Sequence, residues 1–394
     1  MENMQPQSID NDLRFSVVYR IHADGPGDCE TIARDIAIEQ TVETPLACVP
    51  EQLLKDGTIG RIENITPVID KENPSERAGF DATISFRCDI TGFTVPQFLN
   101  LIFGNISLKN NIRIVGFDFP EAFLRSFPGP SHGIDGIRKA LSIWDRPLAC
   151  TALKPLGLCV PELASMAGAF ARGGIDVIKD DHGLGNQPMH PFEERVAHVA
   201  EAVADGNAAT GGRTMYCPMI SGRFDEIERQ IRCVLQAGLK GILIAPMLVG
   251  FDTVRYISEM YNLVIIAHPS LTGTFFSNKR HGMTPAAMLG TLFRLIGADL
   301  SVFPNAGGRF CFTQKECSDL AAALTSPLGH IKPSLPCPAG GMSLERIKEL
   351  WEAYGNDVAL LVGGSLMQHS PDLTASTRIF MEAVKGLRGP ARRS

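Results

Sequence analysis

Hydrophobic and polar residues follow two different patterns along the chain, and the pattern changes near residue 130. In the first third, some runs alternate apolar and polar side chains as half-buried strands do, and others carry apolar side chains at helical spacing. The predicted strands are residues 14–22, 60–68, 80–89 and 111–117, and the predicted helices are residues 29–37 and 95–103. This order, β-α-β-β-α-β, is typical of a ferredoxin-like α+β domain.

Beyond residue 130, short apolar runs alternate regularly with helix-length segments. The predicted strands are residues 148–153, 175–179, 214–220, 241–245, 263–268, 300–303, 331–335 and 358–362, and helices are predicted at 161–171, 225–237, 285–296, 343–354 and 373–385. Eight βα units in about 250 residues are typical of a (β/α)₈ TIM barrel. A doubly wound sheet is the alternative, but no GxGxxG follows the first strand.

The linker between the two patterns is the proline- and glycine-rich run FPGPSH at residues 127–132, before a predicted helix at 133–144. The sequence therefore predicts two domains. Residues 1–130 form the ferredoxin-like α+β domain, and residues 131–394 form the barrel that carries the active site.

The composition excludes several classes of protein. Hydrophobic residues make up 44% and charged residues 20% of the 394 residues, which argues against disorder, a coiled coil or a repeat array. The formal charge is −6 with Lys and Arg scattered, so we expect no nucleic acid or membrane partner. Residues 1–12 resemble no signal peptide, and no apolar run reaches the roughly 18 residues of a membrane span. We therefore expect a cytoplasmic protein. The ten cysteines include no CxxC pair, so no zinc knuckle or redox dithiol is predicted.

Chemically reactive side chains gather where the predicted barrel strands end. Lys154 follows the first strand, the run Lys-Asp-Asp-His at 179–182 ends the second, and His268 ends the fifth. Because the carboxyl ends of barrel strands meet at one mouth, we expect these side chains to lie close together. A buried lysine beside carboxylates is costly unless it is paired, modified or used chemically, so we interpret Lys179 as functional, with a buried salt bridge as the alternative. His268 is either functional or a hydrogen-bonded core histidine.

Glycine pairs follow the last two predicted barrel strands. Gly340 and Gly341 follow the seventh strand, and Gly363 and Gly364 follow the eighth. Backbone N–H groups exposed by such turns suit a phosphate, and barrels usually bind one here. Arg309 follows the sixth strand in a glycine-rich loop, which either closes on an anionic substrate or is an exposed connector.

Taken by themselves, these residues indicate metal-assisted proton abstraction or C–C bond chemistry on a phosphorylated carbonyl compound. A Schiff-base aldolase that uses Lys154 or Lys179 is the main enzymatic alternative. The carboxylates beside Lys179 argue against it, because they hold a lysine protonated whereas a Schiff-base nucleophile must be neutral.

The run GGIDVIKDD at residues 173–181 resembles the metal-binding signature of the RuBisCO superfamily. The similarity extends to TALKP at 151–155, to HGM at 281–283 and to the paired glycines, and it covers nearly the whole chain. The resemblance implies the family's architecture, which is a ferredoxin-like domain followed by an eight-stranded TIM barrel.

The resemblance also implies roles for single residues. It implies that Lys179 is carbamylated by CO₂ and binds Mg²⁺ together with Asp181, and that Lys154 moves the enolisation proton. His182 stands where the family has a glutamate ligand. The identity of the divalent metal is therefore open, because His is a poor partner for Mg²⁺ and a good one for Mn²⁺, Fe²⁺ or Zn²⁺.

Two residues of the first domain bear on assembly. Glu39 and Asn105 stand where the family supplies residues to a neighbouring chain's active site. The resemblance therefore implies a homodimer or a higher oligomer of dimers, with a phosphorylated small molecule as substrate.

Five positions depart from the family's carboxylation residues. His182 replaces the glutamate ligand, and the second lysine after Lys154 is missing. Arg309 replaces the loop-six lysine, Pro269 replaces an arginine and Ala339 replaces a serine. We therefore expect no CO₂ fixation on ribulose bisphosphate, and the chain is similar to the form IV, RuBisCO-like proteins.

For a RuBisCO-like protein, the resemblance implies a lyase or isomerase that acts on a phosphorylated sugar or sugar acid by metal-assisted enolisation or decarboxylation through an enediolate. We favour decarboxylation of 3-oxo-isoapionate 4-phosphate, because a substrate carboxylate would explain the cation at Arg309. The alternatives are a methylthioribulose-1-phosphate isomerase or a diketo-methylthiopentyl-phosphate enolase, for which Met247, Leu248 and Phe251 could line a thioether pocket. The non-enzymatic alternative is a sugar-phosphate-binding protein that has lost its metal.

Overall fold

The structure is a computed structural model that describes residues 13–69, 77–341 and 343–387. It contains two compact units, which divide at Phe127 and Pro128, and the segment Thr272–Met288 groups with the first unit although sequence order alone assigns it to the second. Residues 1–12, whose polar sequence argued against a signal peptide, lie outside the described residues. No helix in the described part of the chain is long and apolar enough to cross a membrane.

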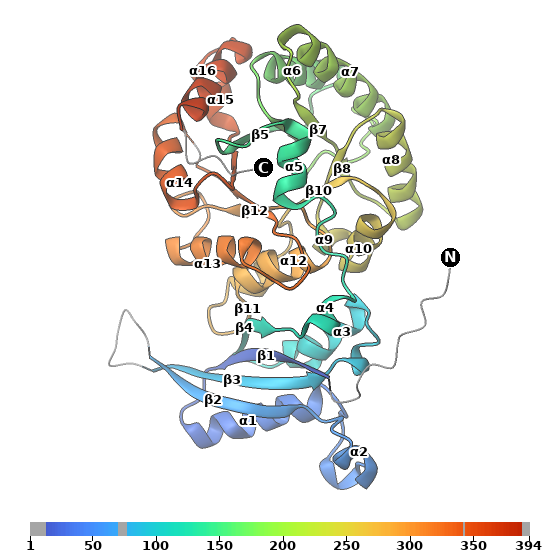
Figure 1. Ribbon diagram of the computed structural model, residues 1–394, viewed down its shortest axis with the longest axis vertical. Helices are drawn as coiled ribbons and strands as arrows, with labels where there is room; N and C mark the ends of the chain where they lie inside the picture. Colours follow the sequence, from blue (N-terminus) through green and yellow to red (C-terminus); the bar gives the residue numbers. More distant parts are fainter. Residues whose placement is uncertain (1–12, 70–76, 342, 388–394) are drawn as a thin grey trace. The chain divides into compact units, whose positions relative to one another are not determined.

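The first unit is built on a five-stranded sheet (Figure 1). In spatial order its strands are β11 (Gly282–Met283), β4 (Ile112–Asp118), β1 (Arg14–Ile21), β3 (Arg77–Arg87) and β2 (Arg61–Ile69). Helix α1 (Pro26–Glu39) follows β1, and α3 (Val95–Phe103) precedes β4. The shorter helical segments are η1 (Leu46–Cys48), α2 (Glu51–Lys55), η2 (Asp89–Thr91), η3 (Asn105–Leu108) and α4 (Glu121–Leu124). The predicted β-α-β-β-α-β order is confirmed.

The apolar alternation of β1 explains its central place in this sheet. Phe15, Val17, Tyr19 and Ile21 are fully buried, and the strand pairs antiparallel with both β3 and β4. Strand β11 was not predicted, because two residues that pair with β4 carry no periodicity for a sequence pattern to reveal.

The second unit is a closed parallel barrel. Its strands are β5 (Leu148–Leu153), β6 (Val177–Asp180), β7 (Met215–Cys217), β8 (Met219–Ile220), β9 (Gly241–Ile244), β10 (Val264–Ala267), β12 (Leu300–Pro304), β13 (Leu335–Ala339) and β14 (Ala359–Leu361). Strands β7 and β8 are two parts of one barrel strand on either side of Pro218, which pair with β6 and β9 respectively. Because β14 pairs with β5, the predicted eight-stranded barrel is confirmed.

Helices cover the outside of the barrel (Figure 1). They are α6 (Val160–Arg172), α7 (Phe192–Thr210), α8 (Phe224–Gln236), α9 (Pro246–Val249), α10 (Phe251–Met260), α12 (Phe293–Leu295), α13 (Gln314–Thr325), α14 (Ile347–Tyr354), α15 (Gly364–His369) and α16 (Leu373–Gly386). The remaining segments are α11 (Gly273–Phe276), a π-helical turn η4 (Ala286–Leu292) and η5 (Leu344–Arg346).

The seventh barrel strand was predicted four residues too early, at 331–335 instead of Leu335–Ala339. The observed strand contains Pro336 and Pro338, which sequence rules exclude from a central strand because proline lacks a backbone N–H. The pairing with β14 is accordingly reduced to Ala339 with Leu361, whereas five residue pairs join β13 to β12.

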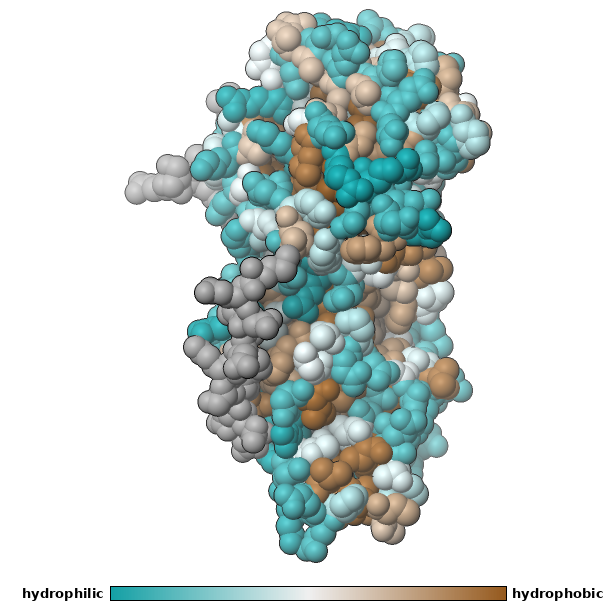
Figure 2. Space-filling model, turned by 90° about the vertical axis from the view of Figure 1, so that its right-hand side faces the viewer, coloured by the Kyte–Doolittle hydropathy of each residue, from teal (hydrophilic) through white to brown (hydrophobic). Residues whose placement is uncertain are grey.

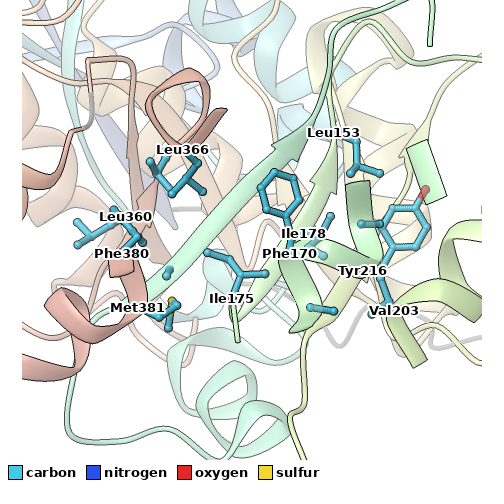
Figure 3. Close-up of a cluster of buried hydrophobic side chains, with 14 of the residues drawn as sticks. Leu153, Phe170, Ile175, Ile178, Val203, Tyr216, Leu360, Leu366, Phe380 and Met381 are labelled. Carbon is cyan, nitrogen blue, oxygen red and sulfur yellow. The ribbon is translucent and has the colours of Figure 1, made fainter. Parts of the chain in front are cut away.

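Two apolar layers hold the barrel together. Alternate strand residues fill its interior, and Ile134, Ile137 and Leu141 of α5 (Gly133–Leu141) pack against them. The other strand residues face the helices, and Leu153, Ile178 and Leu360 belong to one buried cluster with the helix residues Phe170, Phe380 and Met381 (Figure 3). On the face shown in Figure 2, hydrophilic residues cover most of the surface and hydrophobic residues occur in small groups between them.

Candidate active site

The strand period of two directs several predicted site residues into one barrel mouth. Lys154, Lys179 and His268 follow the buried interior residues of β5, β6 and β10 in phase, so their side chains project on the interior side. Asp181 lies within electrostatic reach of Lys179 and Lys154, and His268 lies within reach of Lys179 and Asp181. The structure thus brings together three strand ends that are far apart in the sequence.

Lys179 is almost completely buried, with 2% of its surface exposed. Its Nζ atom donates a hydrogen bond to the backbone carbonyl of Asp180 at 3.0 Å. In the parallel sheet of the barrel, Lys179 lies opposite Ala152 of β5 and Cys217 of β7 in the strand register. No carboxylate of the described residues forms an ion pair with it within 4.0 Å, so the buried salt bridge considered from the sequence is not formed.

The two neighbouring aspartates at the end of this strand lie in different environments. Asp180 is fully buried on the helix side, where it accepts hydrogen bonds from Arg195 Nε at 3.2 Å, Tyr216 Oη at 2.9 Å and the Met219 amide at 3.0 Å. Asp181 projects into the mouth. Burial acts to raise its pKa, but the interaction with His182 and the positive charges of Lys179 and Lys154 outweigh burial and lower that pKa well below its usual range. Only Asp181 is therefore available as an anionic ligand.

Two imidazoles stack at the mouth. The rings of His182 and His268 are nearly parallel, with centroids 4.2 Å apart, and His182 Nδ1 lies 3.5 Å from Asp181 Oδ1. The pKa of His268 is lowered to about 2. Burial is the largest cause, and electrostatic interaction with Lys179 and His182 is the next. His268 is therefore a neutral imidazole at physiological pH.

The tautomer of His268 follows from its neighbours. Its Nδ1 atom accepts a hydrogen bond from the Ser270 amide at 3.2 Å, and the Ser270 hydroxyl lies 2.8 Å away. Because a neutral imidazole that accepts at Nδ1 carries its proton at Nε2, His268 presents an N–H donor on its other side.

Lys154 is half-buried and lies directly against Gly363. A Cβ atom added at Gly363 would be 2.7 Å from Lys154 Nζ and 3.2 Å from its Cε. Gly363 therefore has a second role that sequence reasoning missed, because the absence of its side chain makes room for the lysine.

The glycine turns after β12 and β13 also approach each other closely. Gly340 and Gly341 have φ angles of 82° and 71°, in the left-handed region that favours glycine. A Cβ atom on Gly308 would be 2.8 Å from the Gly340 carbonyl oxygen. Arg346 donates to the carbonyls of Ala306 and Gly341, at 3.1 and 3.4 Å, and so ties the two turns together.

Arg309 lies exposed on its loop, with its guanidinium 5.0 Å from the ring centroid of the adjacent Phe310. Its charge is directed over an aromatic ring of its own loop.

Glu39 and Asn105 belong to the first unit, where the structure brings them together. Asn105 Nδ2 donates to Glu39 Oε1 at 3.1 Å and also to Glu43 Oε1 at 2.9 Å. Sequence reasoning missed Glu43, and no pattern pointed to it. Ser270 was also missed, although a serine two residues after a strand-end histidine is a signal that could have identified it.

The side chains at the mouth supply enough donors for a divalent metal only when Lys179 is carbamylated. The described residues contain no group of three His, Cys, Asp or Glu side chains that could hold a metal ion. Asp181 and His182 supply a carboxylate and an imidazole, and a Lys179 ammonium cannot coordinate. Conversion of the Lys179 amine to a carbamate would add two oxygen donors beside Asp181, so the residues fit a metal in the carbamylated state.

Comparisons with known proteins agree on one family. Residues 133–307 match the family described as "Ribulose bisphosphate carboxylase large chain, catalytic domain". The "Ribulose bisphosphate carboxylase-like protein 1" of Rhodopseudomonas palustris is 39% identical over 381 residues, which cover 95% of this chain and 99% of that protein. The "5-methylthioribulose-1-phosphate isomerase" of Rhodospirillum rubrum is 40% identical over 377 residues, which cover 95% of this chain and 96% of that protein.

Solved structures extend the similarity to the fold. The crystal structure of a Rubisco-like protein from Rhodopseudomonas palustris has a TM-score of 0.85 and 37% identity, covering 97% of this chain and 100% of that chain. An octameric ribulose-1,5-bisphosphate carboxylase/oxygenase from Pyrococcus horikoshii has a TM-score of 0.87 and 28% identity, and the match covers 96% of this chain and 90% of that chain.

Proposed function

We propose that this protein isomerises a phosphorylated keto sugar by moving a proton along its carbon chain. The chain belongs to the RuBisCO-like branch of the ribulose bisphosphate carboxylase large-chain family and is an enzyme of that superfamily, and the proposal proceeds from this membership. The observation that carries this proposal is the convergence of Lys154, Lys179, Asp181 and His268 on one barrel mouth. We propose 5-methylthioribulose 1-phosphate as the substrate, because the relative from Rhodospirillum rubrum that is 40% identical carries that isomerase name.

Proton transfer is assigned to Lys154. Its Nζ atom lies against Gly363, at the start of the turn that leads into α15. The resemblance to the family implies that this lysine moves the enolisation proton. A phosphate bound by the N–H groups of the turns at Gly340–Gly341 and Gly363–Gly364 would place the sugar carbons beside that lysine. As the free amine, Lys154 would take a proton from one carbon, and as the ammonium so formed it would return a proton to another carbon.

The metal site is assigned to carbamylated Lys179, Asp181 and His182. When bound there, a divalent cation supplies Lewis-acid polarisation of the substrate carbonyl, which acidifies the adjacent C–H bond. His268 donates from Nε2 to the oxygen on which negative charge develops, and Ser270 keeps the imidazole in the required tautomer.

An apolar group on the substrate is supported by side chains that follow the barrel strands. Leu156, Leu248, Leu271 and Phe310 follow β5, β9, β10 and β12, and each is more than half exposed. Large apolar side chains exposed at a ligand-binding mouth favour an apolar ligand group over a second phosphate. A thioether meets this requirement.

A second candidate is the decarboxylation of 3-oxo-isoapionate 4-phosphate. The observation that favours it is the cation of Arg309 on the loop after β12, which could bind a substrate carboxylate. The two candidates share the enediolate and differ in whether CO₂ leaves.

The deciding experiment incubates the purified protein with each compound in D₂O, with Mg²⁺ and bicarbonate, and follows the products by ¹H and ³¹P NMR. We expect isomerisation of 5-methylthioribulose 1-phosphate in the wild type and none in Lys154→Ala. Lys348→Ala is the matched control, since that lysine lies exposed on α14. Release of CO₂ from the sugar acid would show that the reaction is a decarboxylation and would overturn the proposed isomerisation. Binding of the compounds without turnover would indicate a sugar-phosphate-binding protein.

We further propose a homodimer in which Glu39 and Asn105 of one chain complete the active site of the other. Lys179→Ala chains would be inactive alone, and Asn105→Ala chains would be strongly impaired alone. Mixed dimers would contain one site with both residues intact, so activity should return after subunit exchange. Mass spectrometry would show whether mixed dimers have formed. If they have formed and no activity returns, the shared site is refuted.

A further inference from the structure

Glu43 lies next to two of the proposed active-site residues, although no sequence pattern singles it out. Its carboxylate and that of Glu39 both accept hydrogen bonds from the same nitrogen, Asn105 Nδ2, at 2.9 and 3.1 Å. Among the described residues neither carboxylate forms an ion pair within 4.0 Å. Two like charges are thus held together by one amide group.

The backbone of Glu43 is also unusual. Its φ angle is 50°, in the left-handed region that residues other than glycine rarely adopt. The amide of Glu43 donates to the Ile38 carbonyl at 3.1 Å, which fixes the turn after α1. A glycine here would form the same turn without strain and without a second carboxylate, so the stability of the turn does not explain the glutamate.

The group stands on a rigid support. Gln40 is 8% exposed, and its side-chain amide donates to the carbonyls of Asn100 and Leu101 at 2.8 and 2.7 Å. Its Oε1 atom accepts from the Ile106 amide at 3.1 Å. Gln40 therefore joins the end of α1 to η3, and it holds the backbones on either side of Asn105 at a fixed spacing.

The hydrogen bonds determine which way the Asn105 amide faces. Carboxylates only accept hydrogen bonds, so the nitrogen of the amide must face the two glutamates, and both of its hydrogens are then used. The Oδ1 atom is turned away from the glutamates. Asn105 therefore presents an acceptor, which is complementary to a hydroxyl group.

We infer that Glu43 is a positioning residue that orients Asn105 so that its Oδ1 atom accepts a hydrogen bond from a substrate hydroxyl in the neighbouring chain's active site. This inference rests on the proposed shared site.

The test compares three substitutions at Glu43. Glu43→Ala removes the acceptor, and we expect kcat to fall about tenfold with little change in KM, as a misoriented contact in the transition state does. Glu43→Gln keeps an acceptor oxygen and should restore most of the activity. Glu43→Gly removes both the acceptor and the strain, so it should lose activity as Glu43→Ala does while its melting temperature does not fall. Glu30→Ala, on the exposed face of α1, is the matched control.

Two measurements separate the inference from the proposal on which it rests. Wild-type turnover in Asn105→Ala would refute the shared site itself. If Asn105→Ala is impaired, adding Glu43→Ala should cause no further loss, and an additional tenfold loss in the double variant would overturn the positioning role. Independently of turnover, the Asn105 side-chain amide, observed by ¹⁵N NMR after selective labelling, should lose the shift of one hydrogen-bonded proton in Glu43→Ala. An unchanged amide signal would equally overturn it.

Discussion

Gly363→Ala is expected to act on Lys154 rather than on the fold. The added Cβ would be 2.7 Å from Lys154 Nζ, whereas ordinary contacts begin at 3.4 Å, so the ammonium must retreat by about 0.7 Å. The clash is with the end of a flexible side chain and not with backbone, so we expect the substitution to be accommodated with little change in melting temperature.

The expected cost lies in catalysis. A displacement of this size at a group that transfers a proton lowers kcat by about 10- to 100-fold, which corresponds to about 1.4–2.8 kcal/mol of transition-state stabilisation. The assay is steady-state turnover of 5-methylthioribulose 1-phosphate, or of whichever phosphorylated ketose the enzyme accepts. Gly386→Ala, whose Cβ would meet no atom within 4 Å, controls for glycine replacement as such.

A double-mutant cycle shows whether the effect passes through the lysine. In a Lys154→Ala background the clash disappears, so Gly363→Ala should cause no further loss of residual turnover or of substrate binding. Equal losses in both backgrounds would mean that the backbone turn, and not the lysine, is disturbed, and the reasoning would be refuted. Wild-type kcat in Gly363→Ala would refute it equally.

Three further predictions concern the carboxylates and imidazoles of the mouth. Asp180→Ala should cost about 3–5 kcal/mol of unfolding free energy in a denaturant titration, because it leaves Arg195 buried and unpaired, whereas Asp181→Ala should abolish turnover with little effect on stability. His182→Glu should tighten Mg²⁺ binding, measured by calorimetry with bicarbonate present, and yet give no ¹⁴CO₂ fixation on ribulose bisphosphate. In protein kept free of CO₂ and metal, so that Lys179 is an ammonium, His268 should remain neutral with its proton on Nε2 down to about pH 4 in ¹⁵N NMR spectra, since its pKa is lowered to about 2. The unfolded chain takes up a proton on this histidine near its ordinary pKa of about 6.5, whereas the folded protein does not. The contribution of His268 to native stability should therefore decrease as the pH falls below about 6.5. An imidazolium signal at pH 5 would contradict the assigned burial.

The residues at the barrel mouth could be predicted from the sequence because a strand has a fixed period. Once Lys154, Lys179 and His268 are placed at the ends of buried runs, the alternation of side chains decides which way they project. The same alternation separates Asp180 from Asp181. The destination of Asp180 was nevertheless not predictable, because its partner Arg195 lies on the next helix and is identified only by packing.

Tertiary contacts explain what the sequence patterns missed. The prolines of β13 obscured that strand, because the rule against proline in central strands assumes a full ladder on both sides, and here the ladder to β14 is a single pair. The contact between Asn105 and Glu43 joins two turns that are 62 residues apart, and neither turn has a period. Close approaches such as that of Lys154 to Gly363 depend on angstrom-scale geometry, which a pattern of residue types does not contain.

If Lys179 is carbamylated as we propose, the charges at the mouth require CO₂ to bind before the metal. With Lys179 as an ammonium, two lysines face one carboxylate and the group is positive, which repels a divalent cation. Carbamylation reverses the sign of Lys179, so that the carbamate and Asp181 together face only Lys154, and a divalent cation is then attracted. CO₂ and metal should therefore bind cooperatively, and metal binding without bicarbonate should be weak. Because His182, which carries no negative charge, stands where the family has a glutamate ligand, a metal-loaded site would be one unit more positive than the family's arrangement. We expect this additional positive charge to stabilise the negative charge that develops on an enediolate.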